Sequence, residues 1–251
     1  MTQHILQDRS EDEIRWFRRR GFLRAAAAWS AMGGFGAAQA QQRTNIVELR
    51  GDALLNGERL NPQRTIQTGD SLETGPGSHL VFVLGNSAFQ VRQNTRMTVE
   101  RGATLSVVSA LRLLTGAVAS VWGRGISRQI VTPTLTAGIR GTGVYTEVLP
   151  EQDLRSYFCN CYGTVEIGAG PERVLSQSVY HQSFWGEPQP RNGRYLTPAR
   201  AINHTDEEME HLAALVGEQT AWQIAGRRGT HDGSGYMEDR PVTEHPANTP
   251  R

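Results

Sequence analysis

The strongest constraint on the fold is a series of short apolar runs that alternate with polar residues from Asn45 onward. The segment HLVFVLGNSAFQVR shows this best, because His79–Leu84 and Ser87–Arg92 flank the turn dipeptide Gly85-Asn86. Successive side chains of a strand point to opposite faces, and a Gly-containing pair suits a two-residue hairpin turn. Many short strands separated by turn residues are typical of an all-β sandwich or roll, so we predict short antiparallel strands over residues 41–200.

The strand pattern continues through three further segments. They are ATLSVVSALRLLTGAVASVW (103–122), QIVTPTLTAGIRGTGVYTEV (129–148) and GTVEIGAG (163–170). The first is expected to break at Thr115-Gly116, because glycine in a strand marks a bend or a bulge.

The pattern becomes helical at Asn203, in NHTDEEMEHLAALVGEQ. Thr205 and Glu208 form a predicted capping box, in which each side chain accepts a hydrogen bond from a backbone amide at the start of the helix. Met209, Leu212, Ala213 and Val216 then form one apolar stripe. We predict a single C-terminal helix within residues 201–225, packed on the β domain. Residues 226–251 are rich in Gly, Pro and charge and predict a disordered tail.

The N-terminal segment RRRGFLRAAAAWSAMGGFGAAQA (18–40) has the order of a signal peptide. Arg19 and Arg20 begin a motif that resembles the twin-arginine export consensus, and Ala38 and Ala40 form a cleavage site. A retained membrane anchor is the alternative, but the stretch 21–40 contains Arg24 and four glycines, which disfavour a permanent span. We therefore expect residues 1–40 to be a twin-arginine signal peptide cut after Ala40, and the remaining chain to be periplasmic.

The charge balance argues against two kinds of partner. The chain contains 26 basic residues, all of them arginine, and 25 acidic residues, so its net charge is close to zero. Nucleic-acid binding needs clustered basic side chains that neutralise phosphates, and binding to an anionic membrane surface needs a similar patch. We expect neither partner.

Four phrases, taken in order, resemble the FecR domain, a periplasmic β domain of proteins that relay iron-siderophore signals. They are GDALLNGERL (51–60), TGDSLETGPGSHLVFVLGNSAFQV (68–91), LLTGAV (113–118) and IVTPTLTAGIRGTGVYTEV (130–148). The resemblance implies a sensing, signalling or scaffolding module of the cell envelope, with an envelope protein or peptidoglycan as partner. Signalling members also carry a cytoplasmic anti-sigma segment, a retained span and a further C-terminal domain. Only residues 1–17 precede the export motif here, so we do not expect control of a sigma factor.

The only two cysteines, Cys159 and Cys161, are separated by one residue. In an oxidising compartment two cysteines suggest a disulfide. However, closing so short a loop contributes only about 1.6 kcal/mol, and residues i and i+2 of a strand have Cα atoms about 6.6 Å apart, at the wide limit for a disulfide. The same spacing places both sulfurs on one face of a strand, where they could bind zinc or copper with His181 and His204 as further ligands. Disulfide, metal binding and thiol redox chemistry all remain open.

No motif points to an enzyme. GIRGTG (138–143) lacks the glycine spacing of a dinucleotide loop, and the sequence has neither a Gly-x-Ser-x-Gly elbow nor a His-Glu-x-x-His motif. We therefore predict no catalytic residues and no organic cofactor. The leading interpretation is a non-catalytic periplasmic FecR-like binding or signalling module. The alternative is a periplasmic metal-binding or thiol-redox protein that uses Cys159 and Cys161.

Overall fold

The computed structural model describes residues 44–233 and Gly235. The predicted signal peptide, with Arg19, Arg20, Ala38 and Ala40, lies outside the described residues, as does most of the predicted tail. Among the described residues, no helix has both the length and the apolar character needed to cross a membrane.

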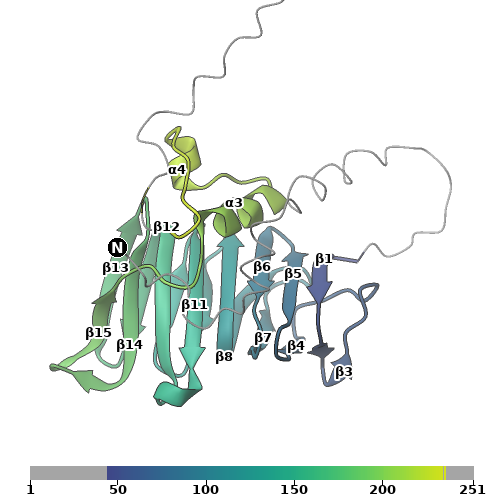
Figure 1. Ribbon diagram of the computed structural model, residues 1–251, viewed down its shortest axis with the longest axis horizontal. Coiled ribbons are helices and arrows are strands. Elements are labelled where there is room, and N and C mark those ends of the chain that lie inside the picture. Colours follow the sequence, from purple (N-terminus) through teal and green to yellow (C-terminus); the bar gives the residue numbers. More distant parts are fainter. Residues whose placement is uncertain (1–43, 234, 236–251) are drawn as a thin grey trace, which may run out of the picture.

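The described chain is an all-β structure, as the sequence predicts, and it is followed by two short helices where one was predicted (Figure 1). The strands are β1 (Ile46–Arg50), β2 (Ala53–Leu55), β3 (Glu58–Arg59), β4 (Ser71–Thr74), β5 (His79–Leu84), β6 (Ser87–Val91), β7 (Arg96–Arg101), β8 (Val108–Trp122), β9 (Arg128–Val131), β10 (Thr136–Ile139), β11 (Gly143–Leu149), β12 (Arg155–Ala169), β13 (Glu172–Ser178), β14 (Gln182–Arg191) and β15 (Arg194–Ala199). A 3₁₀ turn, η1 (Pro150–Gln152), joins β11 to β12, and the helices are α3 (Asp206–Leu215) and α4 (Ala221–Ile224).

The predicted hairpin is confirmed. Strands β5 and β6 pair antiparallel from Leu80 opposite Val91 to Leu84 opposite Ser87, around Gly85-Asn86. Gly85 has φ +61°, a left-handed conformation that glycine adopts without a steric penalty. The local pattern therefore specified this turn and its register.

The strands form two sheets that share β8 and β12. One sheet runs β1-β5-β6-β8-β11-β12-β14-β15, and the other contains β3-β2-β4-β7-β8-β9-β10-β12-β13. All described pairings are antiparallel except that between β8 and β9, which is parallel. The prediction of short strands is wrong for β8 and β12, which are 15 residues each and pass from one sheet into the other.

Glycines allow these two long strands to bend between the sheets. Gly116 has φ +78° and Gly163 has φ +103°, so both lie in the left-handed region. A Cβ atom on Gly163 would approach a side-chain carbon of Thr142 to 2.6 Å. The break expected at Thr115-Gly116 is therefore a bend inside β8 and not the end of a strand.

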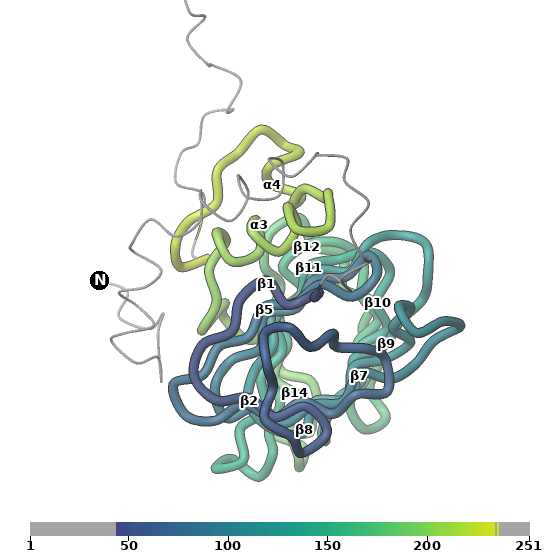
Figure 2. Tube along the Cα trace, turned by 90° about the vertical axis from the view of Figure 1, so that its right-hand side faces the viewer, coloured from purple at the N-terminus to yellow at the C-terminus, as the bar shows by residue number. Residues whose placement is uncertain are grey.

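The main core lies between the two sheets. Viewed as in Figure 2, the strands wrap around this interior, and α3 and α4 lie outside it. Phe82, Phe89, Trp122 and Phe158 are among the largest buried side chains of this core. Their burial follows from the alternation of side chains, since every second residue of each strand faces inward.

A second, smaller apolar cluster, here called the outer cluster, lies between the first sheet and the helices. It contains Ala119, Val121, Cys159, Cys161, Met209, Leu212 and Trp222, with further alanine, valine and tyrosine side chains. Helix α3 contacts β6, β8 and β11. The two cysteines thus belong to the layer between sheet and helix and not to the main core.

The helical segment differs in detail from its prediction. The capping box is confirmed, because Thr205 accepts a hydrogen bond from the Glu208 amide and Glu208 accepts one from the Thr205 amide. Helix α3 ends at Leu215, before Gly217 at φ +71°, and α4 is a separate short helix. The boundary of the disordered tail at residue 226 is placed too early, because residues 226–233 are described and the amide of Thr230 bonds to Asp206.

Candidate metal centre

The two cysteines lie on the face of β12 that points toward the helices. Both are buried with no exposed surface, and the strand alternation directs Phe158 into the main core instead. Tyr145 of β11 and Ser183 of β14 lie opposite Cys159 on the neighbouring strands. The prediction that both sulfurs share one face of a strand is therefore confirmed.

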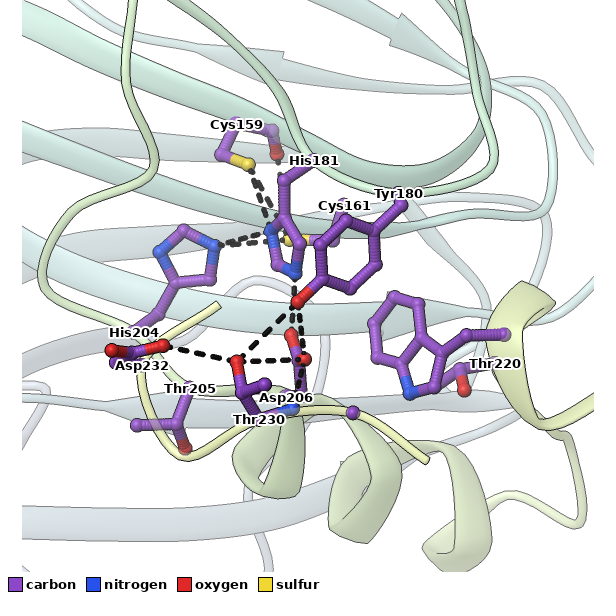
Figure 3. A network of polar contacts seen from close by, with 12 residues as sticks. Cys159, Cys161, Tyr180, His181, His204, Thr205, Asp206, Thr220, Thr230 and Asp232 are labelled. Carbon is purple, nitrogen blue, oxygen red and sulfur yellow. Dashed lines mark hydrogen bonds and ion pairs between the residues drawn. The ribbon is translucent and has the colours of Figure 1, made fainter. Parts of the chain in front are cut away.

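The two histidines reach the cysteines from separate segments. His181 lies between β13 and β14 at φ +35°, and its amide donates a hydrogen bond to the carbonyl of Cys161. His204 immediately precedes Thr205, the N-cap of α3, and follows Asn203 at φ +58°. Figure 3 shows both imidazoles directed at the sulfurs. Three segments that are distant in sequence thus meet at one point.

The structure brings all four predicted ligand residues together. One ligand atom from each of Cys159, Cys161, His181 and His204 lies within 4.8 Å of the others. The two Sγ atoms are 3.7 Å apart, each sulfur is 3.4 Å from an imidazole nitrogen, and His181 Nδ1 is 3.0 Å from His204 Nε2. Tetrahedral zinc with ordinary bond lengths needs separations of about 3.8 Å between sulfurs, about 3.5 Å between sulfur and nitrogen and about 3.3 Å between nitrogens. These four separations differ from the tetrahedral values by a few tenths of an ångström, and the other two, Cys159 to His204 and Cys161 to His181, are at most 4.8 Å.

Partners outside the cluster decide which imidazole nitrogens face the sulfurs. His204 Nδ1 lies 2.6 Å from the carbonyl oxygen of Ile202, which can only accept, so Nδ1 carries the hydrogen. His181 Nε2 lies 2.6 Å from Oδ1 of Asp206 and donates to it. His181 Nδ1 and His204 Nε2 are therefore the nitrogens directed into the cluster. Metal-binding histidines are oriented in the same way, by a carboxylate or a carbonyl on the far nitrogen.

The cluster also shifts the protonation of its members. Burial alone would raise the pKa of the Cys159 thiol, but the hydrogen bond from Cys161 and the imidazoles of His204 and His181 outweigh it and lower that pKa well below its ordinary value. Burial raises the pKa of Cys161, and the neighbouring Cys159 raises it further. For His181, burial would lower the pKa, but the Cys159 charge and the bond to Asp206 raise it to about 9. Cys159 therefore favours the thiolate, the form of cysteine that binds metal.

Asp206 is the functional residue that the sequence analysis missed. Its carboxylate is fully buried and accepts hydrogen bonds from His181, from the Tyr180 hydroxyl at 2.7 Å and from the Thr230 amide at 2.5 Å. The sequence shows only an acidic residue in the first turn of a helix. Such residues are common there, because a negative charge interacts favourably with the positive end of the helix dipole. The contact with His181 depends on how the turn before β14 meets α3, which no local pattern encodes.

Aromatic rings pack around the two imidazoles. Tyr145 stacks on His204 with ring centroids 4.7 Å apart, and Trp222 of α4 stacks on His181 at 5.5 Å. The Trp222 indole donates to Glu210 at 2.7 Å, so its ring is held in place. These contacts leave the imidazoles little rotational freedom.

Cys159, His181 and Asp206 are also joined in series, as a nucleophile, a base and a carboxylate would be. Such an array can activate a thiol for acyl transfer when a substrate reaches the sulfur. Here the sulfur of Cys159 has no exposed surface and the side chain of His181 is only 2% exposed. The burial makes this arrangement suited to holding an ion rather than to attacking a substrate.

The two cysteines are not joined by a disulfide in this structure. Their sulfur separation of 3.7 Å allows the hydrogen bond from Cys161 to Cys159 and is far longer than the roughly 2.05 Å of a disulfide bond. The sulfurs are nonetheless neighbours, so oxidation would need only a local movement of β12.

The fold and the cluster together define an all-β protein with a buried Cys₂His₂ group beneath a short helix.

No family model matches the chain and no curated protein matches it, so the FecR resemblance depends on the sequence motifs. Two crystal structures of a proposed anti-sigma factor from Parabacteroides distasonis ATCC 8503, at 1.65 and 2.50 Å resolution, are similar to the chain. The 2.50 Å structure has 12% identity and a TM-score of 0.43, with 64% of each chain covered. The 1.65 Å structure has 11% identity and a TM-score of 0.43, with 62% of this chain and 63% of that one covered. The chain thus spans less than two thirds of the structures that it matches.

Proposed function

We propose that this protein binds one zinc ion through Cys159, Cys161, His181 and His204, and that it is a binding or signalling module without catalytic activity. The observation that supports the proposal is the convergence of four soft or borderline ligand atoms within 4.8 Å, with no exposed surface on either cysteine. Four protein ligands in a closed site are typical of structural zinc, whereas catalytic zinc keeps one position open.

The mixed ligand set favours zinc over most other metals. Calcium and magnesium prefer oxygen ligands, and none of the four ligand atoms is an oxygen. Copper is the alternative, because thiolates also bind Cu(I). Two imidazole nitrogens beside two sulfurs favour zinc, because Cys₂His₂ is a common ligand set of structural zinc sites.

The wider role that we propose is inferred from the sequence motifs. The FecR resemblance and the twin-arginine motif support a periplasmic module that senses or scaffolds in the cell envelope, with an envelope protein or peptidoglycan as partner. In such a module the zinc ion would hold α3 against the sheet that carries the cysteines, because its ligand His204 directly precedes the N-cap of α3.

Metal analysis of the exported protein tests the zinc proposal. We expect one zinc per chain by elemental mass spectrometry after dialysis, and cobalt substitution should give the visible bands of a tetrahedral thiolate site. His204→Ala should lose the metal, whereas His211→Gln on the same segment should retain it. Stoichiometric copper with no zinc would show that the site binds copper and not zinc. Absence of any metal in the full chain would reject the site.

The thiol pair supports a second candidate function. Because the sulfurs are 3.7 Å apart, a two-electron oxidant could join them in a disulfide with release of two protons, and an external dithiol could reduce that disulfide again. The mass of the denatured chain, purified without reductant, distinguishes the two. A loss of two hydrogens, with no metal found by elemental analysis, supports the disulfide. The mass of the fully reduced chain, with one zinc found by elemental analysis of the same sample, supports the metal site.

A further inference from the structure

A buried ion pair lies between the end of β6 and the start of α3. Arg92, which directly follows β6, has its Nη2 atom 2.5 Å from Oε1 of Glu208. The Glu208 side chain has no exposed surface, and that of Arg92 is 7% exposed. Gln90 donates a further hydrogen bond of 2.5 Å to the same carboxylate oxygen. The sequence predicts only a capping role for Glu208, whereas the structure connects its side chain to the sheet.

The second oxygen of Glu208 holds the backbone next to His204. Oε2 accepts a hydrogen bond of 2.7 Å from the amide of Thr205, the residue that directly follows His204. Because Arg92 and Gln90 both bind Oε1, the carboxylate cannot turn away from this amide without breaking buried polar contacts. The ion pair therefore fixes the backbone on the C-terminal side of His204.

A second carboxylate holds the backbone on the N-terminal side of His204. Oε2 of Glu147 in β11 accepts a hydrogen bond of 2.9 Å from the side-chain amide of Asn203 and another of 2.9 Å from the Tyr145 hydroxyl. Asn203 has φ +58°, a left-handed conformation that persists only where the surrounding structure holds it. His204 thus lies between two backbone positions, each held by a carboxylate.

Arg92 also contacts the ring that packs on His204. Its Cζ atom lies 5.5 Å from the centroid of the Tyr145 ring, a distance at which a guanidinium is attracted to an aromatic face. The Tyr145 ring in turn stacks on the His204 imidazole, with an angle of 11° between the ring planes. Arg92 therefore acts on His204 by two routes, one through Glu208 and Thr205 and the other through Tyr145.

None of these contacts involves Nε2 of His204, the nitrogen that faces the sulfur of Cys161. They can therefore form before a metal ion binds, and a ligand that is fixed in advance loses less conformational entropy on binding. We propose that Arg92 and Glu208 are positioning residues for His204, which hold its imidazole in the orientation that the metal requires; this rests on the proposed zinc function.

The test is Arg92→Met in the full chain, with zinc as the probe. Methionine keeps a long unbranched side chain but leaves Glu208 buried without its cation, so the carboxylate and the Thr205 amide should shift. We expect the zinc affinity, measured by competition with a chelator, to fall by about tenfold or more, the size of effect typical of groups that orient a metal ligand. The visible bands of the cobalt-substituted protein should shift as well, because His204 is displaced. Arg92→Lys retains the charge and should recover part of the affinity.

Arg155→Met is the matched control. Arg155 also pairs with a buried glutamate, Glu187 at 2.7 Å, and also lies over an aromatic ring, that of Trp185. This variant should lose stability but keep the zinc affinity and the cobalt bands of the parent. An equal loss of affinity in both variants would assign the effect to general destabilisation and overturn the positioning role. Parent-like affinity and bands in Arg92→Met would overturn it as well.

A measurement without metal separates the positioning role from the zinc proposal. The Nδ1–H group of His204 donates to the carbonyl of Ile202 at 2.6 Å, and its proton should give a slowly exchanging NMR signal in the metal-free parent. Arg92→Met should exchange this proton faster or lose the signal. If the parent binds no zinc, the proposed function fails, and an unchanged signal in Arg92→Met would then reject the positioning role separately. If Arg92→Met does not fold, Gln90→Met replaces it and should give smaller changes in the same directions, because it removes only the neutral hydrogen bond to Glu208.

Discussion

His181 Nε2 lies 2.6 Å from Oδ1 of Asp206, with both side chains almost completely buried. The contact joins the turn before β14 to the first residue of α3. It fixes the orientation of the imidazole so that Nδ1 faces Cys159. The pair therefore links the first turn of α3 to one of the proposed metal ligands.

The first prediction concerns this carboxylate. Asp206→Asn should weaken zinc binding by about 10- to 100-fold, because the amide is a poorer acceptor for the His181 N–H and does not carry the charge that favours it. The affinity is measured by competition with a chelator of known affinity. Glu166→Gln, which removes an exposed carboxylate on the other sheet, serves as the control and should bind zinc like the parent. Equal affinity in Asp206→Asn would show that the contact does not position the ligand.

The local parts of this fold could be predicted from the sequence. The hairpin at Gly85-Asn86 and the capping box at Thr205 each depend on a few neighbouring residues, and both are present. The shared face of Cys159 and Cys161 follows from the alternation along a strand. The choice of His181 and His204 as partners came from residue chemistry alone, and the structure brings both to the sulfurs.

The parts that depend on distant contacts could not be predicted. The passage of β12 from one sheet to the other depends on Gly163 meeting Thr142, which is 21 residues earlier in the chain. The role of Asp206 depends on a turn 25 residues away. Residues 229–233 have the composition of a disordered tail, and the contacts that place them are made mainly with residues more than 20 positions earlier in the chain, such as Asp206.

The second prediction concerns removal of the metal. Zinc that binds only the folded chain stabilises it by mass action, by about 2.7 kcal/mol at a free concentration of 100 times Kd. A strong chelator should therefore lower the Tm of the parent protein, and added zinc should restore it. Differential scanning calorimetry of the parent and of Cys159→Ser measures this. The variant should show no response to zinc or chelator, and a similar response in both proteins would place the stabilising ion elsewhere.

The third prediction concerns the bend in β12. Gly163→Ala should destabilise the fold by about 2 kcal/mol or more, because φ +103° is strained for alanine and the new methyl group would meet Thr142. Gly138→Ala is the control in the paired strand β10, since a Cβ there has only ordinary contacts from 3.7 Å. Urea unfolding gives both free energies. Similar values for the two variants would mean that β12 can cross between the sheets without a glycine.

The fourth prediction concerns acid stability, through a second buried carboxylate away from the metal cluster. Arg155 donates two hydrogen bonds of 2.7 Å to Glu187, and its guanidinium stacks on Trp185. Burial alone would raise the pKa of Glu187, but the hydrogen bonds from Arg155 and Thr197 outweigh it and hold the pKa below its ordinary value. Folding therefore favours the ionised form of Glu187.

The sign of the pH effect follows from this shift. A carboxylate whose pKa is lowered by folding contributes its full stabilisation above the unfolded-state pKa, about 4.3 for Glu, and loses it as the pH falls through the folded-state value. Glu187→Gln should cost about 2 kcal/mol at pH 7, and its difference from the parent should shrink below about pH 4. Glu73→Gln, which breaks an exposed ion pair with Arg96, should cost less than about 1 kcal/mol at either pH. Urea unfolding from pH 7 to pH 3 measures both differences, and a constant cost for Glu187→Gln across that range would show that the pair is held by packing on Trp185 and not by charge.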